Sequence, residues 1–268
     1  MLLHRNFARA VACLAIALSL ALGNARAADN NAPNPERERE LLAILKSEAP
    51  KADKALACKH LAVHGTDAAV PELSRLLIDE QLASWARIAL EVIPGPAADE
   101  ALRKALDSTA GLLQVGAINS IGVRRDAGAI DILTTRLNDQ DPEVASAAAV
   151  ALGMIGNAAA TKSLQNVLGT SPANVRSAVA EGLVLCAERR LAADDAKGAV
   201  ELYDALRKAE VPKQRVLEAT RGAILTRKDE GIPLLVENLN SADKAMFQLA
   251  LQTAREFPGK KVDEALAA

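Results

Sequence analysis

The stretch "DPEVASAAAVALGMIGNAAATKSLQNVL", residues 141–168, recurs along the chain at an interval of about 30 residues. Moved 31 residues toward the N-terminus, it aligns with "TAGLLQVGAINSIGVRRDAGAIDILTTRL", residues 109–137. A fixed period of roughly 20–50 residues indicates a repeat architecture. The register continues in both directions, and two apolar columns mark it: Ala57, Ala86, Ala117, Ala148 and Val179, then Leu61, Leu90, Ile121, Leu152 and Leu183.

Each unit is predicted to contain two helices. In the unit quoted above, Val144, Ala148 and Leu152 have the spacing of one helix face, while Asp141 and Pro142 supply a cap and a first-turn proline. One helical pair cannot bury its apolar face alone, so neighbouring pairs must stack to complete the core. The sequence therefore predicts an all-α fold: an α-solenoid, wound as a right-handed superhelix, of about six to seven stacked helix pairs.

The composition agrees with closely packed helices. Half of the residues are hydrophobic, but only 2% are aromatic. Helices whose axes approach closely need small side chains at the contact, and one column of the repeat supplies them: Ala89, Ser120, Ala151, Gly182 and Gly222.

The segment "DPEVASAAAVALGMIG" resembles the first helix of a HEAT repeat, especially the short HEAT-like units of phycobilisome lyases. Ala145 stands where that pattern often has arginine, although the next unit has Arg176. Residues 51–268 as a whole resemble exported HEAT-repeat proteins of planctomycete-type bacteria. The resemblance implies a solenoid scaffold without catalytic residues, and a bilin lyase activity is disfavoured because aromatic residues that would hold a tetrapyrrole are scarce. The matching residues are Asp141, Pro142, Val144, Ala148, Ala151, Leu152, Gly153, Ile155 and Gly156.

The chain is predicted to begin with a secretory signal peptide. Its basic start, an apolar run and the small-x-small sequence Ala25-Arg26-Ala27 are typical of one. The last repeat should be incomplete, because the chain ends at "VDEALAA" where a second helix begins. The predicted organisation is a signal peptide at 1–27, a polar linker at 28–34, an N-terminal capping helix at 35–50 and the solenoid at 51–268, with a longer irregular unit at about 171–209.

Charge and motifs exclude several functions. Removal of residues 1–27 takes away three arginines and no acidic residue, so the net charge falls from −2 to −5. Nucleic-acid binding normally requires a basic surface, and the apolar run at the N-terminus is too short for stable membrane insertion. No dinucleotide-binding, phosphate-loop, haem-attachment or serine-nucleophile motif occurs. We therefore expect a non-enzymatic chain without cofactors, located in the periplasm or outside the cell.

A cysteine and two histidines occur close together in "ACKHLAVHG", residues 57–65. On a helix, His60 and His64 share one face while Cys58 points elsewhere, so a three-ligand metal site is disfavoured and the two histidines stay weak candidates. Cys58 and Cys186 are four repeats apart, too far for a disulfide, and are expected to be free, buried thiols.

Two groups of charged residues are candidates for binding a partner. Arg124 and Arg125 end a first helix and Asp126 can cap the next one, which explains them structurally, or they contact an anion or carboxylate. The run "ERERE", residues 36–40, is expected to be solvated surface. The candidates on the second helices are Arg75, Arg103, Lys104, Arg136 and Lys208.

Two functions remain open at this stage. The first is an exported scaffold that holds another protein, of unknown identity, on the solenoid surface. The alternative is the non-catalytic HEAT-repeat portion of a larger exported enzyme or electron-transfer protein, with a sugar-active or cytochrome c partner domain.

Overall fold

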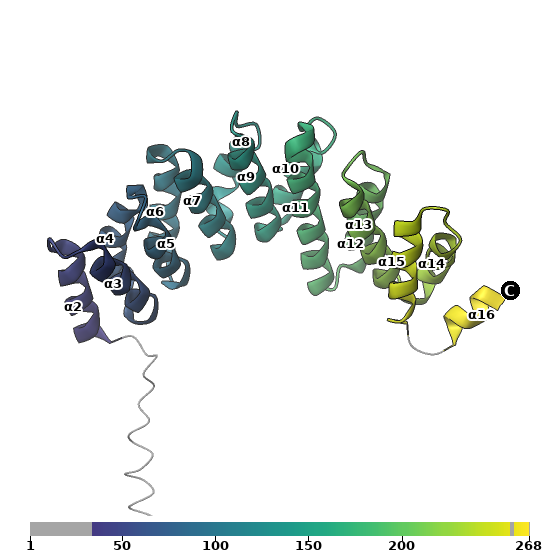
Figure 1. Ribbon diagram of the computed structural model, residues 1–268, viewed down its shortest axis with the longest axis horizontal. Helices are drawn as coiled ribbons and strands as arrows, with labels where there is room; N and C mark the ends of the chain where they lie inside the picture. Colours follow the sequence, from purple (N-terminus) through teal and green to yellow (C-terminus); the bar gives the residue numbers. More distant parts are fainter. Residues whose placement is uncertain (1–33, 258–259, 268) are drawn as a thin grey trace, which may run out of the picture.

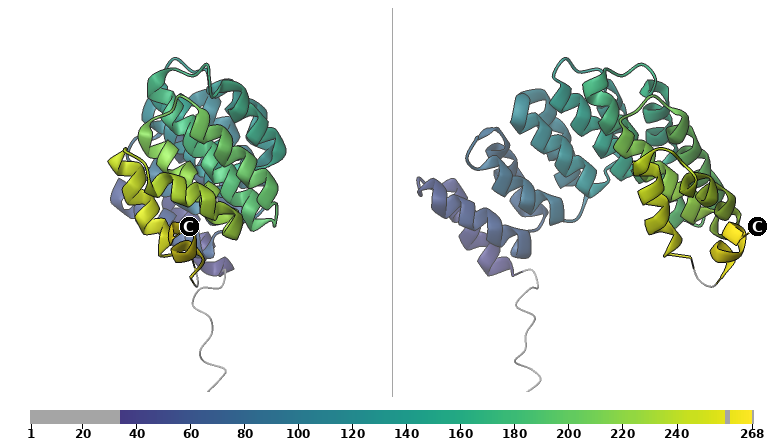
Figure 2. Two further views of the ribbon diagram at one scale, coloured as in Figure 1. Left: turned by 90° about the vertical axis from the view of Figure 1, so that its right-hand side faces the viewer. Right: turned by 45° about the vertical axis from the view of Figure 1, so that its right-hand side comes forward.

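The computed structural model describes residues 34–257 and 260–267, and over this part the chain is an all-α solenoid. Fifteen α-helices, α2 to α16, stand side by side in chain order, and the stack bends into an arch with α2 at one end and α16 at the other (Figures 1 and 2). No strand occurs among these residues. The predicted signal peptide, and all of the linker except Asn34, lie outside the described residues.

The helices form two layers that alternate along the chain. The helix α2 (Pro35–Lys46) precedes the first pair, and 3-10 turns extend several second helices: η1 (Asp67–Ala69), η2 (Leu76–Ile78), η3 (Ala127–Ala129) and η4 (Lys228–Gly231). The first helices of the pairs are α3 (Lys51–His64), α5 (Ala83–Val92), α7 (Gly111–Arg124), α9 (Pro142–Ile155), α11 (Ala173–Ala192), α13 (Lys213–Thr226) and α15 (Lys244–Ala254). The second helices are α4 (Val70–Arg75), α6 (Pro96–Ser108), α8 (Ile130–Arg136), α10 (Ala158–Val167), α12 (Ala196–Lys208), α14 (Ile232–Leu239) and α16 (Lys261–Ala267).

Side-chain caps fix where several helices begin. The Asp141 carboxylate accepts a hydrogen bond from the Glu143 backbone N–H at 2.9 Å, and Pro142 occupies the first turn of α9. Asn157 caps α10 in the same way, accepting from the Ala160 N–H at 2.9 Å. Such caps satisfy backbone donors that have no partner within the helix.

The two apolar columns identified in the sequence are buried. Every member, from Ala57 and Leu61 to Val179 and Leu183, is at most 1% exposed. The buried residues from α2 to α13 form one continuous core, and a second cluster at the C-terminal end contains Ile224, Leu235 and Val262. The repeat register therefore defines the core, as nearest-neighbour stacking requires.

The helix α2 covers the first repeat through one buried carboxylate as well as apolar contacts. Leu41 and Leu45 are buried, and so is Glu38, which is 6% exposed. The Thr66 backbone N–H donates to Glu38 Oε1 at 2.7 Å and the Thr66 hydroxyl donates to the same oxygen at 2.9 Å. The expectation that the run at 36–40 is wholly solvated was wrong at Glu38, because that side chain faces the end of α3.

The first helices approach one another at the level of the backbone. A Cβ atom added at Gly182 of α11 would lie 2.5 Å from the Ala149 carbonyl oxygen of α9, and one added at Gly153 would lie 2.5 Å from the Gly182 Cα. Only glycine fits this contact, so α9 and α11 are joined more tightly than larger side chains would allow.

Replacing Gly182 with alanine should therefore destabilise the solenoid. Alanine favours a helix over glycine by about 1 kcal/mol, but overpacking costs about 1–3 kcal/mol. We expect a lower urea midpoint in circular dichroism. The matched control is Gly169→Ala, since a Cβ atom there meets nothing within 4 Å. A midpoint for Gly182→Ala that equals or exceeds that of the wild type would show that the helices can move apart at no cost.

Candidate interaction surface

Three of the five basic candidates on the second helices are exposed. Arg75 pairs with Glu72 at 2.9 Å and Lys104 pairs with Glu100 at 2.6 Å, each on its own helix, and Lys208 is exposed near the end of α12. Exposed pairs of this kind contribute little to stability. Arg75 and Lys104 can therefore exchange their intramolecular partners for groups of another molecule, and the exposed Lys208 is accessible to such groups as well.

The other two basic candidates make internal contacts. The Arg103 guanidinium forms an ion pair with the carboxylate of Asp126, which is 8% exposed. Arg136 pairs with Asp139 at 3.1 Å and donates to the Leu106 carbonyl at 3.4 Å. Both arginines therefore connect neighbouring segments of the solenoid.

The three residues Arg124, Arg125 and Asp126 have different roles. The Arg124 guanidinium pairs with Asp99 and donates to the carbonyl oxygens of Leu90 and Ile93, each at 2.6 Å. It thereby neutralises the C-terminal end of α5, where a cation is favoured by the helix dipole. Asp126 accepts from the Gly128 N–H at 2.9 Å and caps η3.

Arg125 differs from its two neighbours because its side chain is exposed. It follows α7 in the left-handed region, with φ at 56°, and its backbone N–H closes the helix by donating to the Gly122 carbonyl. Among these three residues it is the one whose side chain is free to contact another molecule.

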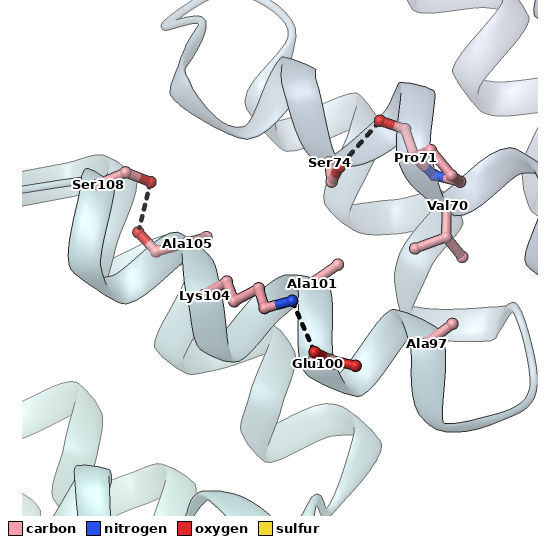
Figure 3. A pocket seen from close by; sticks show the side chains of 9 residues that line it. All are labelled: Val70, Pro71, Ser74, Ala97, Glu100, Ala101, Lys104, Ala105 and Ser108. Atoms are coloured by element: carbon pink, nitrogen blue, oxygen red, sulfur yellow. Dashed lines mark hydrogen bonds and ion pairs between the residues drawn. The ribbon is translucent and has the colours of Figure 1, made fainter.

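A depression of about 320 Å³ lies between the second helices α4 and α6 (Figure 3). Val70 and Pro71 from α4 face Ala97 and Ala101 of α6 across it, and the Lys104–Glu100 pair lies at its edge. It is an open depression, and its polar side chains are paired within the chain: Lys104 with Glu100, and the Ser74 and Ser108 hydroxyls with the Pro71 and Ala105 carbonyl oxygens.

Two further depressions lie on the first helices. One, of about 490 Å³ between α3 and α5, is lined by Leu56, Lys59 and Trp85. The other, of about 290 Å³ between α11 and α13, has the buried Tyr203 at its base, packed against Gly222. Burial, and secondarily the Glu188 carboxylate, raises the pKa of Tyr203 to about 12.

Large apolar side chains are exposed along the first helices at the N-terminal end. Leu56 is 53% exposed, Trp85 is 38% and Val92 is 57%. The helices α3, α5 and α7 pack against each other in sequence, so these side chains belong to one surface. The sequence predictions assigned partner binding to charged residues and missed this surface, although the register indicated it: some outward positions of the first helices, among them Val63, Val92 and Val123, are apolar.

His60 and His64 are both half-buried on α3. Within residues 34–257 and 260–267, no group of three or more histidine, cysteine, aspartate or glutamate side chains could hold a metal ion. Cys58 and Cys186 are both buried and free, which confirms the expectation for the two thiols. In the same part of the chain no helix is both long and apolar enough to span a membrane.

The two buried thiols should be inert toward alkylation in the folded protein. Burial raises the pKa of Cys58 to about 11 and also raises the pKa of Cys186. At pH 8 about 0.1% of Cys58 is then thiolate, the reactive form. In a Cys13→Ser chain, we expect iodoacetamide to alkylate no cysteine in buffer and both Cys58 and Cys186 in urea. Mass spectrometry measures the number of labels. Labelling of the folded chain would show that α3 or α11 opens readily.

Arg124→Ala should destabilise the protein by about 1–3 kcal/mol, because it removes a partly buried ion pair and leaves the carbonyl oxygens at the end of α5 without their side-chain donor. Arg125→Ala is the matched control, since it keeps the same backbone conformation and loses an exposed side chain, with an expected change within about 0.5 kcal/mol. Urea unfolding followed by circular dichroism measures both. Equal effects of the two changes would contradict the assigned role of Arg124.

A match to a known family model agrees with this architecture. Residues 100–184 match a family model described as HEAT repeats, and no curated protein matches the chain. The structure of human deoxyhypusine hydroxylase in complex with glycerol is similar at 20% identity and a TM-score of 0.43, over 74% of this chain and 93% of that chain. Two engineered proteins are similar at 21% and 20% identity with TM-scores of 0.35 and 0.33, over 86% and 83% of this chain and 98% of each of theirs. The described chain is thus an all-α solenoid in which residues 100–184 match HEAT repeats.

Proposed function

We propose that this protein is a non-enzymatic scaffold that binds another protein on the surface of its solenoid. The observation that carries the proposal is the group of exposed apolar side chains on the successive helices α3, α5 and α7: Leu56, Val63, Trp85, Ile88, Val92 and Val123. Soluble proteins rarely expose large contiguous apolar patches unless another molecule covers them. A stack of repeats offers an extended surface on which many such contacts form at once.

The proposal includes export from the cytoplasm. It rests on the N-terminal sequence, in which a basic start, an apolar run and Ala25-Arg26-Ala27 have the order of a cleavable signal peptide. The resemblance of residues 51–268 to exported HEAT-repeat proteins of planctomycete-type bacteria supports the same assignment. The partner would then be a periplasmic or extracellular protein.

Partner capture with matched variants tests the interaction. Trp85→Asp combined with Ile88→Asp places two charges on the exposed apolar surface of α5 and should remove at least 90% of a co-purified envelope protein, quantified by mass spectrometry. Ile78→Asp is the control, because Ile78 is 58% exposed but belongs to η2 in the other layer. A set of captured proteins that is the same for all three chains would contradict the proposal.

A further inference from the structure

One outward position of the first helices is apolar in six successive repeats. It lies two residues after the buried core residue of each helix, which turns it about 200° around the helix axis and away from the core. In the first five helices that core residue is Leu61, Leu90, Ile121, Leu152 or Leu183, and in α13 it is Ala223. We call this set the first-helix stripe: Val63, Val92, Val123, Met154, Leu185 and Leu225.

The stripe is accessible along its length. Val63, Val92 and Val123 are exposed, and Met154, Leu185 and Leu225 are half-buried. An outward position that makes no core contact tolerates polar residues, which favour solubility. Since the first helices pack in order from α3 to α13, the six side chains form one line across the solenoid. Its continuity distinguishes it from apolar residues scattered singly over a surface.

The centre of the stripe is hollowed. Val123, Met154 and Leu185 line a depression of about 390 Å³ whose floor contains Gly122 and Gly153. A Cβ atom at Gly122 would lie 2.9 Å from both the Ala151 Cα and the Met154 sulfur, so a larger residue at this position would displace the side chains that line the depression. The volume of this depression is large enough to accept an apolar side chain from another molecule.

Two unpaired arginines stand at the edge of this depression. Arg125 and Arg189 both line it and neither forms an ion pair or hydrogen bond through its side chain in the described part of the chain, whereas neighbouring Arg124 and Arg190 pair with Asp99 and Asp195. The one carboxylate at the same edge is that of Glu188. The edge is therefore locally positive on a chain whose net charge is negative, and it complements a carboxylate.

We propose that the first-helix stripe binds an extended polypeptide segment of the partner protein, with an apolar side chain in the central depression and an aspartate or glutamate held by Arg125 and Arg189. The inference rests on the proposed scaffold function and specifies the partner's chemistry. Adjacent helices are about 10 Å apart, so six of them span about 50 Å, which an extended segment covers with about 15 residues. A single acyl chain or small molecule is too short to follow the stripe.

Selection from a displayed library of random 15-residue peptides tests this assignment on the full chain. Enriched peptides should combine apolar residues with an acidic residue, and their affinity should fall at least tenfold for Arg125→Glu with Arg189→Glu. That variant should instead select peptides with lysine or arginine. Val123→Asp with Met154→Asp should also abolish binding. Arg75→Glu with Lys104→Glu, on the other layer, is the matched control and should bind like the wild type.

Circular dichroism and urea midpoints establish that each variant is folded, and Arg125→Ala with Arg189→Ala replaces the glutamate pair if that pair is not. Peptides that tolerate every stripe variant but are lost with Arg75→Glu and Lys104→Glu would overturn the inference and leave the scaffold function standing. Failure to enrich any peptide would also overturn it, while partner capture separately decides the scaffold function. Self-association that the glutamate pair disrupts would make the stripe an interface between copies and would equally refute it.

Discussion

The close approach of the first helices is the constraint on which the rest of the structure depends. Gly153 of α9 and Gly182 of α11 bring two backbones together with no side chain between them. The residues of the small column on the earlier helices, Ala89, Ser120 and Ala151, are equally buried. Because the small column is buried in the first helices from α5 to α11, each of these helices packs closely on the next, and their outward positions fall into line.

Polar side chains supply the second set of links between repeats. Arg87 of α5 lies over Gly116 of α7, where it donates to the Gly116 carbonyl at 3.0 Å and to the Ser120 hydroxyl at 3.3 Å. The Ser120 hydroxyl in turn donates to Glu91 at 2.7 Å. A guanidinium has several donors in a fixed planar arrangement, so it satisfies carbonyl and hydroxyl oxygens of an adjacent helix at once. Arg124 uses the same property at the end of α5.

These links explain why charge was a poor guide to the interaction surface. Arg124 and Asp126 lie, like Arg125, at the junction between α7 and η3. Their sequence environment resembles that of Arg125, yet their side chains are engaged within the chain and that of Arg125 is not. Only the spatial position of Asp99 and of the α5 carbonyl oxygens decides between the two roles.

The sequence by itself determined the all-α solenoid, the repeat register and the buried columns, because apolar periodicity and helix caps act locally and recur in every unit. It also determined that Cys58 and Cys186 are separate, since their distance follows from counting repeats. The tertiary structure decided which charged side chains pair with a neighbouring repeat, that Glu38 of α2 is buried against Thr66, and that Arg125 and Arg189 line one depression. Those outcomes depend on residues that are 23 to 64 positions apart in the sequence, and helix packing sets their geometry, which no local pattern contains.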